Sequence, residues 1–386
     1  MEFDNKIIKS PSRWIEMKKP KVLILGPRLS SQGGVRTYVK TILDSRLVDE
    51  YTLLYLETGL NATDAHLFSR LHRISVDTIK LITTIITKNP NLVHINPSFA
   101  WKAFWRDSWY LLLSKCLGKK TIFCFHGGGS PKEFYLRNNQ VLRLLTKRVL
   151  IHVDRILVLS QSAKKEIEEI TQRKDVMVIP HGIDSTKFKP SGAFREDYGI
   201  REDTVVILFM GRFLREKGVY ETLDAIPIVL ERFKNILFVF AGDGPERCDM
   251  MKFCDENKFG GHVRFLGWLS EEAKINALTG SNIFIFPTLV YEGLPMVMLE
   301  AMAVGLPVIA SRNEPLPEFL RDGKNGFLVN PKNPKDFAER ITELAEDRKL
   351  RSVMGKNNQK DVGGRYGLGG FIDNMKNVYD EMMRHE

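Results

Sequence analysis

The chain has 386 residues, of which 43% are hydrophobic and 27% charged, a balance typical of a soluble globular protein. No apolar run approaches the roughly 18 residues of a membrane span, and residues 1–20 lack the apolar core of a secretory signal. The net charge of +10 is uneven, because residues 1–190 carry +14 and residues 191–386 carry −4. We therefore expect a cytoplasmic protein whose first half attracts anionic partners, with a solvated basic face as the alternative.

Short apolar runs recur between amphipathic stretches along the whole chain. Each run is continuous rather than alternating, which is typical of strands buried on both faces in a parallel sheet. Two successive series of such strands predict an α/β protein with two Rossmann-like domains. The predicted strands are 22–25, 51–56, 92–95, 121–125, 155–159 and 176–179, then 204–210, 236–240, 263–266, 283–286, 307–310 and 326–329.

The join between the two series lies near residues 181–192, where Gly and Pro occur and the strand pattern restarts. We predict an N-terminal extension over residues 1–20, a first domain over 21–188 and a second over 189–365. The last segment, 366–386, carries a predicted amphipathic helix at 371–383, after the glycine-rich GGRYGLGG.

In open parallel sheets, ligands bind at the carboxyl ends of the strands. After the first predicted strand, Gly33 and Gly34 precede a predicted helix at Val35. Backbone amides at such a helix start can bind an anion, and a flexible turn is the alternative. The fingerprint GxGxxG is absent here and after strand 236–240, which argues against a dinucleotide-dependent oxidoreductase.

Three tryptophans stand at helical spacing in residues 99–120, namely Trp101, Trp105 and Trp109. With Lys102 and Arg106 beside them, the pattern is compatible with a helix at a membrane interface. A crossover helix must also bury one face, so we expect the tryptophans to pack in the core.

Two further strand ends carry polar side chains. His126 follows strand 121–125 and stands beside three glycines, so it could reach a ligand that approaches the backbone; a structural histidine is the alternative. Arg212 and Lys217 follow strand 204–210. Two cations there could hold a diphosphate and stabilise it as a leaving group without a metal, unless they are ordinary surface charges.

The stretch YEGLPMVMLE places Glu292 and Glu300 at the ends of an apolar run. Pro295 suits a helix start, so a buried helix is predicted from there. Eight helical steps span about 12 Å, whereas glycosidase carboxylate pairs lie roughly 5 to 9.5 Å apart. The glutamates therefore fit two points on an elongated ligand, with free amides near Leu294 and Met296 facing an anion between them. A nucleotide sugar has this layout.

Together these segments resemble the retaining glycosyltransferases of the large GT-B group usually called family 4. The resemblance runs from about Lys21 to about Tyr379. Its pieces are SQGGV (31–35), FHGGG (125–129), VIPHGID (178–184), GRFLREKG (211–218), AGDGP (241–245), VRFLGWLS (263–270), EGLPMVMLEAMAVGLPVIAS (292–311) and NGFLVNPKNPKDFAERI (325–341).

The resemblance implies a GT-B fold, with two facing Rossmann-like domains and a terminal helix that returns to the first domain. It implies that Glu300 binds the ribose hydroxyls of the donor, and that Glu292 and His126, the predicted catalytic residues, lie beside the donor sugar. The predicted donor-binding residues are Gly33, Gly34, Arg212, Lys217, Gly293, Leu294, Pro295, Met296 and Glu300. Two positions depart from the family pattern: Glu314 with Pro315 stands where glycine is frequent, and His181 where asparagine is common.

The implied function is transfer of a sugar from a nucleoside-diphosphate sugar to a cell-surface polysaccharide or a lipid-linked glycan, with retention of anomeric configuration. No cofactor and no metal are expected, and no DxD triplet occurs. A sugar-nucleotide epimerase on the same fold is the alternative, while nucleic-acid binding is disfavoured because no recognised module is present. The acceptor is expected at the basic first domain, which would also contact the inner face of the cytoplasmic membrane. The donor base, UDP or GDP, the sugar and the linkage are left open.

Overall fold

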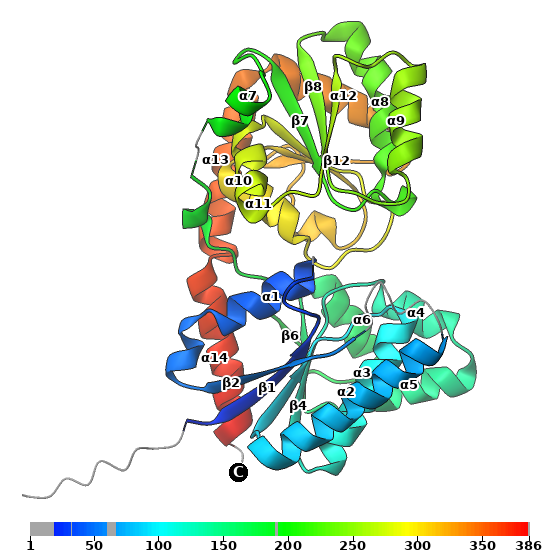
Figure 1. Cartoon of the computed structure of the whole chain (residues 1–386), viewed down its shortest axis with the longest axis vertical. Helices are drawn as coiled ribbons and strands as arrows, with labels where there is room; N and C mark the ends of the chain where they lie inside the picture. The colour runs from blue at the N-terminus through cyan, green and yellow to red at the C-terminus, as the bar shows by residue number, and fades with distance from the viewer. Residues whose placement is uncertain (1–18, 32, 60–66, 190–191, 385–386) are drawn as a thin grey trace, which may run out of the picture.

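The structure is a computed structural model of the whole chain and describes residues 19–31, 33–59, 67–189 and 192–384. Most of the predicted extension 1–20 lies outside these residues. Two parallel six-stranded sheets form the frame, which confirms the prediction of two α/β domains. Figure 1 shows the two domains one above the other, with α14 (Leu368–Arg384) returning to the domain that contains β1.

The first sheet has the strand order β2-β1-β3-β4-β5-β6. Its strands are β1 (Lys21–Gly26), β2 (Thr52–Glu57), β3 (Leu92–Ile95), β4 (Lys120–Cys124), β5 (Arg155–Val158) and β6 (Met177–Val178). The other elements of this domain are α1 (Gly34–Leu43), η1 (Arg46–Asp49), α2 (Leu67–Lys88), α3 (Trp101–Cys116), α4 (Pro131–Arg137), α5 (Gln140–His152) and α6 (Gln161–Thr171).

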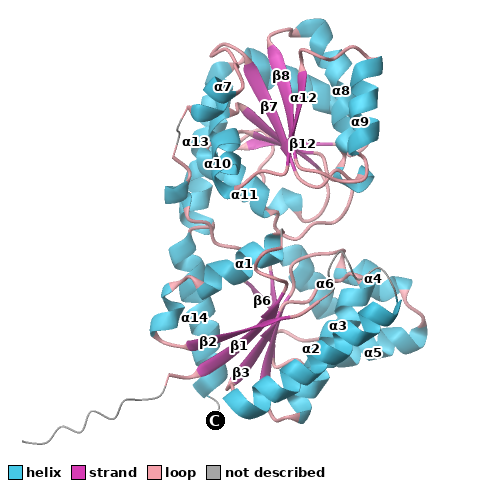
Figure 2. Ribbon diagram, viewed as in Figure 1, coloured by secondary structure: helices cyan, strands magenta, loops and turns pink. Residues whose placement is uncertain are grey.

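Helices cover both faces of this sheet, as Figure 2 shows. Val22 and Ile24 of β1 pack with α1 and α14, whereas Leu23 and Leu25 pack with α2 and α3. Successive side chains of a strand point to opposite faces, so a strand covered on both faces must be apolar throughout. This is why the continuous apolar runs predicted the strands correctly.

The second sheet has the order β12-β11-β10-β7-β8-β9. Its strands are β7 (Val205–Met210), β8 (Ile236–Ala241), β9 (Val263–Gly267), β10 (Ile283–Phe286), β11 (Val308–Ser311) and β12 (Gly326–Val329). The other elements are η2 (Ser185–Lys187), α7 (Ala193–Asp197), η3 (Arg215–Lys217), α8 (Val219–Arg232), α9 (Arg247–Glu256), α10 (Glu271–Gly280), α11 (Met296–Val304), η4 (Leu316–Glu318), α12 (Pro334–Glu346) and α13 (Arg348–Arg365).

The C-terminal helix α14 packs on the first domain, as the resemblance implied. The hydroxyl of Tyr379 lies 2.8 Å from Nδ1 of His94 in β3, and Lys120 donates to the carbonyl of Met382 at 2.8 Å. The glycine-rich stretch before it does not form a long loop. Gly363 and Gly364 lie inside α13, and the helices are interrupted only around Tyr366 and Gly367.

The expectation that the three tryptophans pack in the core is wrong. Trp101 and Trp109 are 48% and 44% exposed, because α3 buries a neighbouring face that includes Phe104 and Leu111. Trp105 is only partly buried. Among the described ranges, no helix combines the length and the hydrophobicity of a membrane span.

Candidate active site

The candidate residues gather where the strand order of each sheet reverses. In the second sheet, β7 and β10 are neighbours although they are not consecutive in the chain, and the segments 211–218 and 287–295 follow them. In the first sheet, the corresponding neighbours are β1 and β3. Loops diverge from such a switch point, which leaves a crevice for a ligand. Figure 1 places α1 and α11 where the two domains meet.

Glu300 lies in the middle of α11 and is 6% exposed. One carboxylate oxygen accepts a hydrogen bond from Nζ of Lys274 in α10 at 2.6 Å, and Lys274 also lies 3.0 Å from Glu271. Burial raises the pKa of the Glu300 carboxyl, and the ammonium of Lys274 opposes that rise. The hydrogen bond from Lys274 therefore fixes the Glu300 carboxylate, whose buried neighbours in α11 are apolar.

Glu292 lies in the loop between β10 and α11. Its carboxylate forms an ion pair with Nζ of Lys217 and accepts a hydrogen bond from the hydroxyl of Thr288 at 3.0 Å. The loops come this close because Gly218 has no side chain: a Cβ there would lie 1.9 Å from the carbonyl oxygen of Pro287. Arg212 is exposed, and no hydrogen bond or ion pair joins its guanidinium to another described residue.

Two glycine-rich loops of the first domain touch the start of α11. A Cβ on Gly34 would lie 3.7 Å from Cγ of Met296, so the backbone at Gly34 adjoins the free amides at the start of α11. A Cβ on Gly127 would lie only 2.6 Å from the backbone nitrogen of Gly293. The structure therefore brings predicted residues of both domains into direct contact.

His126 is held within the first domain by both ring nitrogens. Nε2 lies 2.8 Å from the side-chain oxygen of Asn96, whose amide nitrogen donates to the carbonyl of Leu25. The Asn96 oxygen must accept, so His126 carries its proton on Nε2. Its Nδ1 lies 3.5 Å from Nε2 of His181, and the two rings are stacked.

This histidine group is neutral at ordinary pH. Burial, with His181 and His94 nearby, holds the pKa of His126 well below its usual value. Burial lowers the pKa values of His94 and His181 to about 3. A neutral imidazole donates from one ring nitrogen and accepts at the other, which matches the contacts of His126 with Asn96 and His181.

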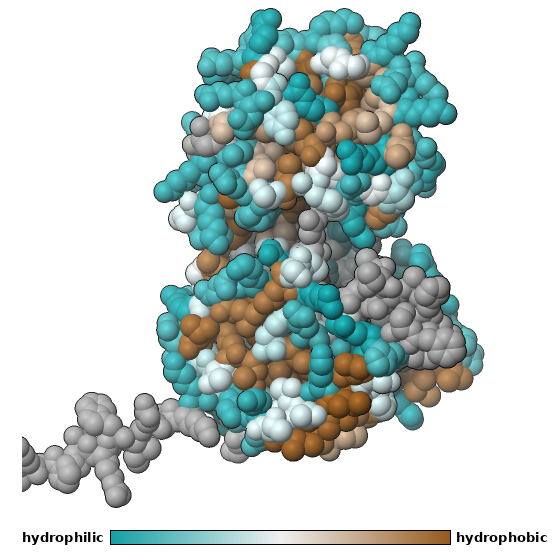
Figure 3. Space-filling view, viewed as in Figure 1, coloured by the Kyte–Doolittle hydropathy of each residue, from teal (hydrophilic) through white to brown (hydrophobic). Residues whose placement is uncertain are grey.

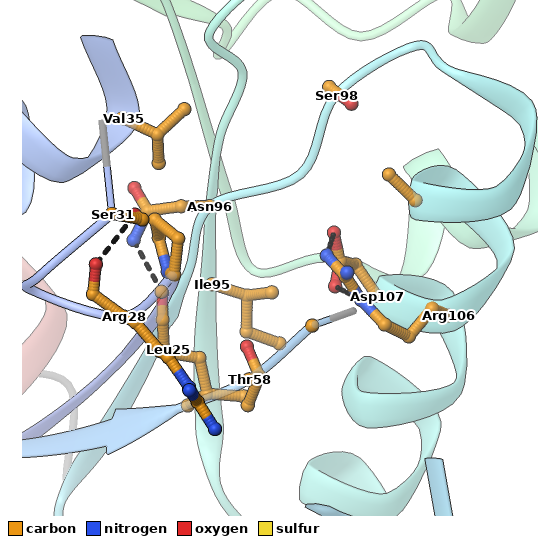
Figure 4. Close-up of a pocket in the computed structure, with 14 residues that line it drawn as sticks. Leu25, Arg28, Ser31, Val35, Thr58, Ile95, Asn96, Ser98, Arg106 and Asp107 are labelled. Carbon is orange, nitrogen blue, oxygen red and sulfur yellow. Dashed lines mark hydrogen bonds and ion pairs between the residues drawn. The ribbon is translucent and has the colours of Figure 1, made fainter. Parts of the chain in front are cut away.

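A cavity of about 320 Å³ opens at the β1/β3 switch point of the first domain. Figure 4 shows that its walls come from the ends of β1, β2 and β3 and from α3. Arg106 is paired with Asp107 at 2.8 Å, whereas the guanidinium of Arg28 has no partner among the described residues. Asn96 lines the cavity and also binds His126, so the cavity adjoins the histidine group.

The sequence predicted the charged candidates of the site but not the side chains that contact them in the structure. Lys274, Thr288 and Asn96 were not predicted. Asn96 directly follows strand β3, so the rule that polar residues after a strand mark a site would have found it. Lys274 lies in α10, 26 residues before Glu300, and no local sequence pattern predicts that the two side chains form a pair.

Two family models match the chain. "Glycosyl transferases group 1" matches residues 191–361, and "Glycosyltransferase Family 4" matches residues 55–187. An uncharacterised glycosyltransferase of Methanocaldococcus jannaschii is 32% identical over 58% of this chain and 59% of its own length. The spore coat protein SA of Bacillus subtilis is 29% identical over 48% of its length, so the chain spans only about half the length of these two relatives. The alpha-D-kanosaminyltransferase of Streptomyces kanamyceticus is 29% identical over 73% of its length.

Solved structures share the fold at low identity. Sucrose-phosphate synthase from Thermosynechococcus elongatus matches 95% of this chain and 100% of its own with a TM-score of 0.79 and 18% identity. HepE of Anabaena, in complex with UDP and glucose, covers 94% of this chain and 100% of its own with a TM-score of 0.75 and 16% identity. These likenesses support the predicted two-domain GT-B fold.

Proposed function

Because the chain belongs to the glycosyltransferases of group 1 and family 4, we propose that it transfers a sugar from a nucleoside-diphosphate sugar to a glycan or lipid-linked acceptor. The observation that carries the proposal is the layout of the second-domain site. Glu292 and Lys217 are paired where β7 and β10 end, the α11 amides come next, and Glu300 is buried further along the helix.

Each part of this layout matches one part of a nucleotide sugar. In the proposal, Glu292 contacts the sugar hydroxyls, and Glu300 binds the ribose diol. Lys217, Arg212 and the helix start neutralise the diphosphate as it leaves. The backbone at Gly34 adjoins the same helix start and would add a second set of amides.

Retention of configuration and independence from metals belong to the same proposal. With cations and helix amides on the diphosphate, the leaving group needs no metal to stabilise it. We expect turnover to persist in excess EDTA and the product to keep the donor's anomeric configuration by NMR. Loss of turnover in EDTA that added Mg²⁺ restores would contradict the first expectation.

Product analysis tests transfer against the rival reaction. We expect UDP- or GDP-sugars to raise the melting temperature, because ligands that bind only the folded state stabilise it. With donor alone, we expect slow hydrolysis at most, and with acceptor, a glycosylated product. Rapid isomerisation of the sugar nucleotide without acceptor would instead identify a sugar-nucleotide epimerase.

The acceptor is proposed to enter the cavity at the β1/β3 switch point, which is lined by Ser31, Thr58, Asn96 and Ser98 among others. These side chains offer hydrogen bonds of the kind that sugar hydroxyls need. The unpaired Arg28 adds one positive charge at the rim, which suits an acceptor with an anionic group.

We also propose that the first domain docks on the inner face of the cytoplasmic membrane through α5. The outer face of this helix is apolar, with Val141, Leu144 and Leu145 exposed by 67%, 51% and 40%. The helix contains Arg143, Lys147 and Arg148 but no acidic residue. Figure 3 shows hydrophobic side chains at the lower right edge, where Figure 1 places α5. An apolar face flanked by cations is the pattern of helices that lie on anionic lipid.

A further inference from the structure

A carboxylate of the second domain caps a helix of the first. The two oxygens of Glu318, in η4, accept the backbone N–H groups of Gln161 at 2.7 Å and of Ser162 at 2.6 Å. These residues begin α6, whose own N-cap Ser160 accepts the N–H of Ala163 at 3.1 Å. The first N–H groups of a helix lack partners within it and carry partial positive charge, so a carboxylate satisfies them well. The cap of α6 is therefore completed across the domain boundary.

Tyr291 of the second domain lies beside this cap. Together with Gly293, it lines a small cavity against the first domain. The first-domain residues of that cavity include Phe99, Phe125, Leu159, Ser160 and Ala163. An aromatic ring in such a setting contributes apolar contact, while the Glu318 carboxylate contributes direction through two hydrogen bonds.

Tyr291 and Gly293, which both face the first domain, flank Glu292 in the chain. Tyr291 directly precedes Glu292, and Gly293 follows it with its backbone against His126: a Cβ on Gly293 would lie 2.6 Å from the His126 carbonyl oxygen. A movement that separates the two domains would lengthen both the Glu318 hydrogen bonds to α6 and the approach of the Glu292 loop to the His126 loop. The Glu318 contact and the contact between the Glu292 and His126 loops therefore lie on the same boundary between the domains.

We propose that Glu318 is a positioning residue, which holds the two domains in the arrangement where the Glu292 loop meets the His126 loop by capping α6. The inference rests on the proposed transfer reaction for its kinetic consequence, because the donor is assigned mainly to the second domain and the acceptor to the first. Loss of the contact should then slow transfer while leaving donor affinity nearly unchanged.

The chain supplies its own reporters of the domain arrangement. Cys116 in α3 and Cys248 in α9 are exposed, one in each domain, whereas Cys124 and Cys254 are buried. A fluorescent donor and acceptor attached to the two exposed thiols would report the interdomain distance in single molecules. The parent, Glu318→Gln and Glu318→Ala are compared. Glu346→Gln, an exposed glutamate at the end of α12, is the control with the same change of charge.

We expect one narrow distance distribution for the parent and for Glu346→Gln, and a second population for Glu318→Ala. We expect kcat for transfer to fall about tenfold in Glu318→Ala, with donor Kd within about twofold of the parent. The lost contact affects how the two domains are placed, whereas the donor is assigned mainly to the second domain alone. Glu318→Gln should be intermediate, since its amide oxygen still accepts one N–H without the charge.

An unchanged distance distribution together with an unchanged kcat in Glu318→Ala would overturn the inference. If Glu318→Ala does not fold, as judged by its melting curve, Glu318→Gln decides, because it keeps the side-chain volume. Absence of sugar transfer by the parent would remove the proposed function, but the distance distributions would still test the Glu318 contact.

Discussion

Glu300 and Lys274 form a largely buried ion pair, and the removal of one partner has two effects. The remaining charge loses its buried partner, which lowers stability, and any ligand contact made by the lost group disappears. Glu292, in the loop before α11, differs, because it is less buried than Glu300 and forms its ion pair with Lys217. The two glutamates of the EGLPMVMLE stretch therefore make separable predictions.

Glu300→Ala should weaken donor binding strongly and also lower the melting temperature, because Lys274 loses its buried partner and keeps only the more exposed Glu271. Glu292→Ala should lower kcat more than it weakens donor binding, because it contacts the sugar rather than the nucleotide. Calorimetric titration with the donor and steady-state kinetics separate the two effects. If neither substitution altered donor affinity or rate, the assignment of the site would be wrong.

The buried histidines predict a loss of stability in acid. The pKa values of His94 and His181 are lowered to about 3, so the unfolded chain binds protons that the folded protein excludes. The contribution of these two histidines to the free energy of unfolding is complete above about pH 6.5. It falls as the pH drops toward 3, by on the order of 4 kcal/mol per histidine.

Denaturant titrations at several pH values would measure this dependence in the parent, in His181→Asn and in His152→Asn. His181→Asn should show a smaller loss of unfolding free energy between pH 6.5 and pH 4. His152 is exposed at the end of α5, so His152→Asn should behave as the parent does. Parallel curves for all three proteins would contradict the prediction.

At the level of single residues, the sequence singled out Glu292 and Glu300 as candidate site residues but not the groups that contact them. Strand ends and glycine-rich turns are local patterns, so His126, Lys217 and Glu292 could be identified from their neighbours in the chain. The partners Lys274 and Asn96 come from other elements, and the pairing depends on a tertiary arrangement that no local pattern encodes. Glu318 is the extreme case, because its partner amides lie in the other domain.

At the scale of elements, α3 and α5 show that a sequence pattern predicts a helix more easily than it predicts which face of the helix is buried. The aromatic stripe of α3 predicted a helix correctly, yet Trp101 and Trp109 point outward. In α5 the buried residues Thr146 and Leu150 face the core, while Val141, Leu144 and Leu145 face solvent. Which face is buried depends on how the helix is placed on the sheet, and side-chain hydrophobicity alone does not decide it.

The exposed apolar face of α5 predicts binding to anionic membranes. We expect the parent to sediment with vesicles that contain phosphatidylserine or phosphatidylglycerol, less so at high salt, and not with neutral vesicles. The double substitution Leu144→Asp with Leu145→Asp should reduce binding about tenfold or more, because it removes the apolar contact and adds like charge to the lipid.

Val353→Asp is the matched control for this experiment. Val353 is an apolar side chain of α13, 48% exposed, in the second domain, so it should leave vesicle binding unchanged. Equal binding to neutral and anionic vesicles at low salt would contradict the electrostatic part of the prediction. A concentration-dependent dimer that disappears in the double variant would instead identify the α5 face as a contact between two copies.

For the whole molecule, the point where the strand order reverses in the first sheet faces the corresponding point in the second sheet. The loops that follow β4 and β10 meet through the backbone of Gly127 and Gly293. The sequence predicted both sheets, because each strand is apolar throughout, and it identified the glycines at their ends. It could not predict that Gly127 and Gly293 meet, since that contact depends on how the domains are placed. The meeting of two residues without side chains lets the His126 and Glu292 loops approach more closely than any other pair of residues would allow.

This junction predicts a substitution that affects transfer but spares the separate domains. In Gly293→Ala the new Cβ would lie 2.6 Å from the carbonyl oxygen of His126, a distance that forces the loops apart. We expect kcat to fall at least about tenfold, because the displacement acts on the contact between domains. Gly364→Ala is the control, since a Cβ at that position in α13 meets nothing within 4 Å. Scattering profiles and transfer kinetics of both variants test the prediction. A Gly293→Ala protein with the parental kcat would show that the close approach of Gly293 to His126 is not needed for transfer.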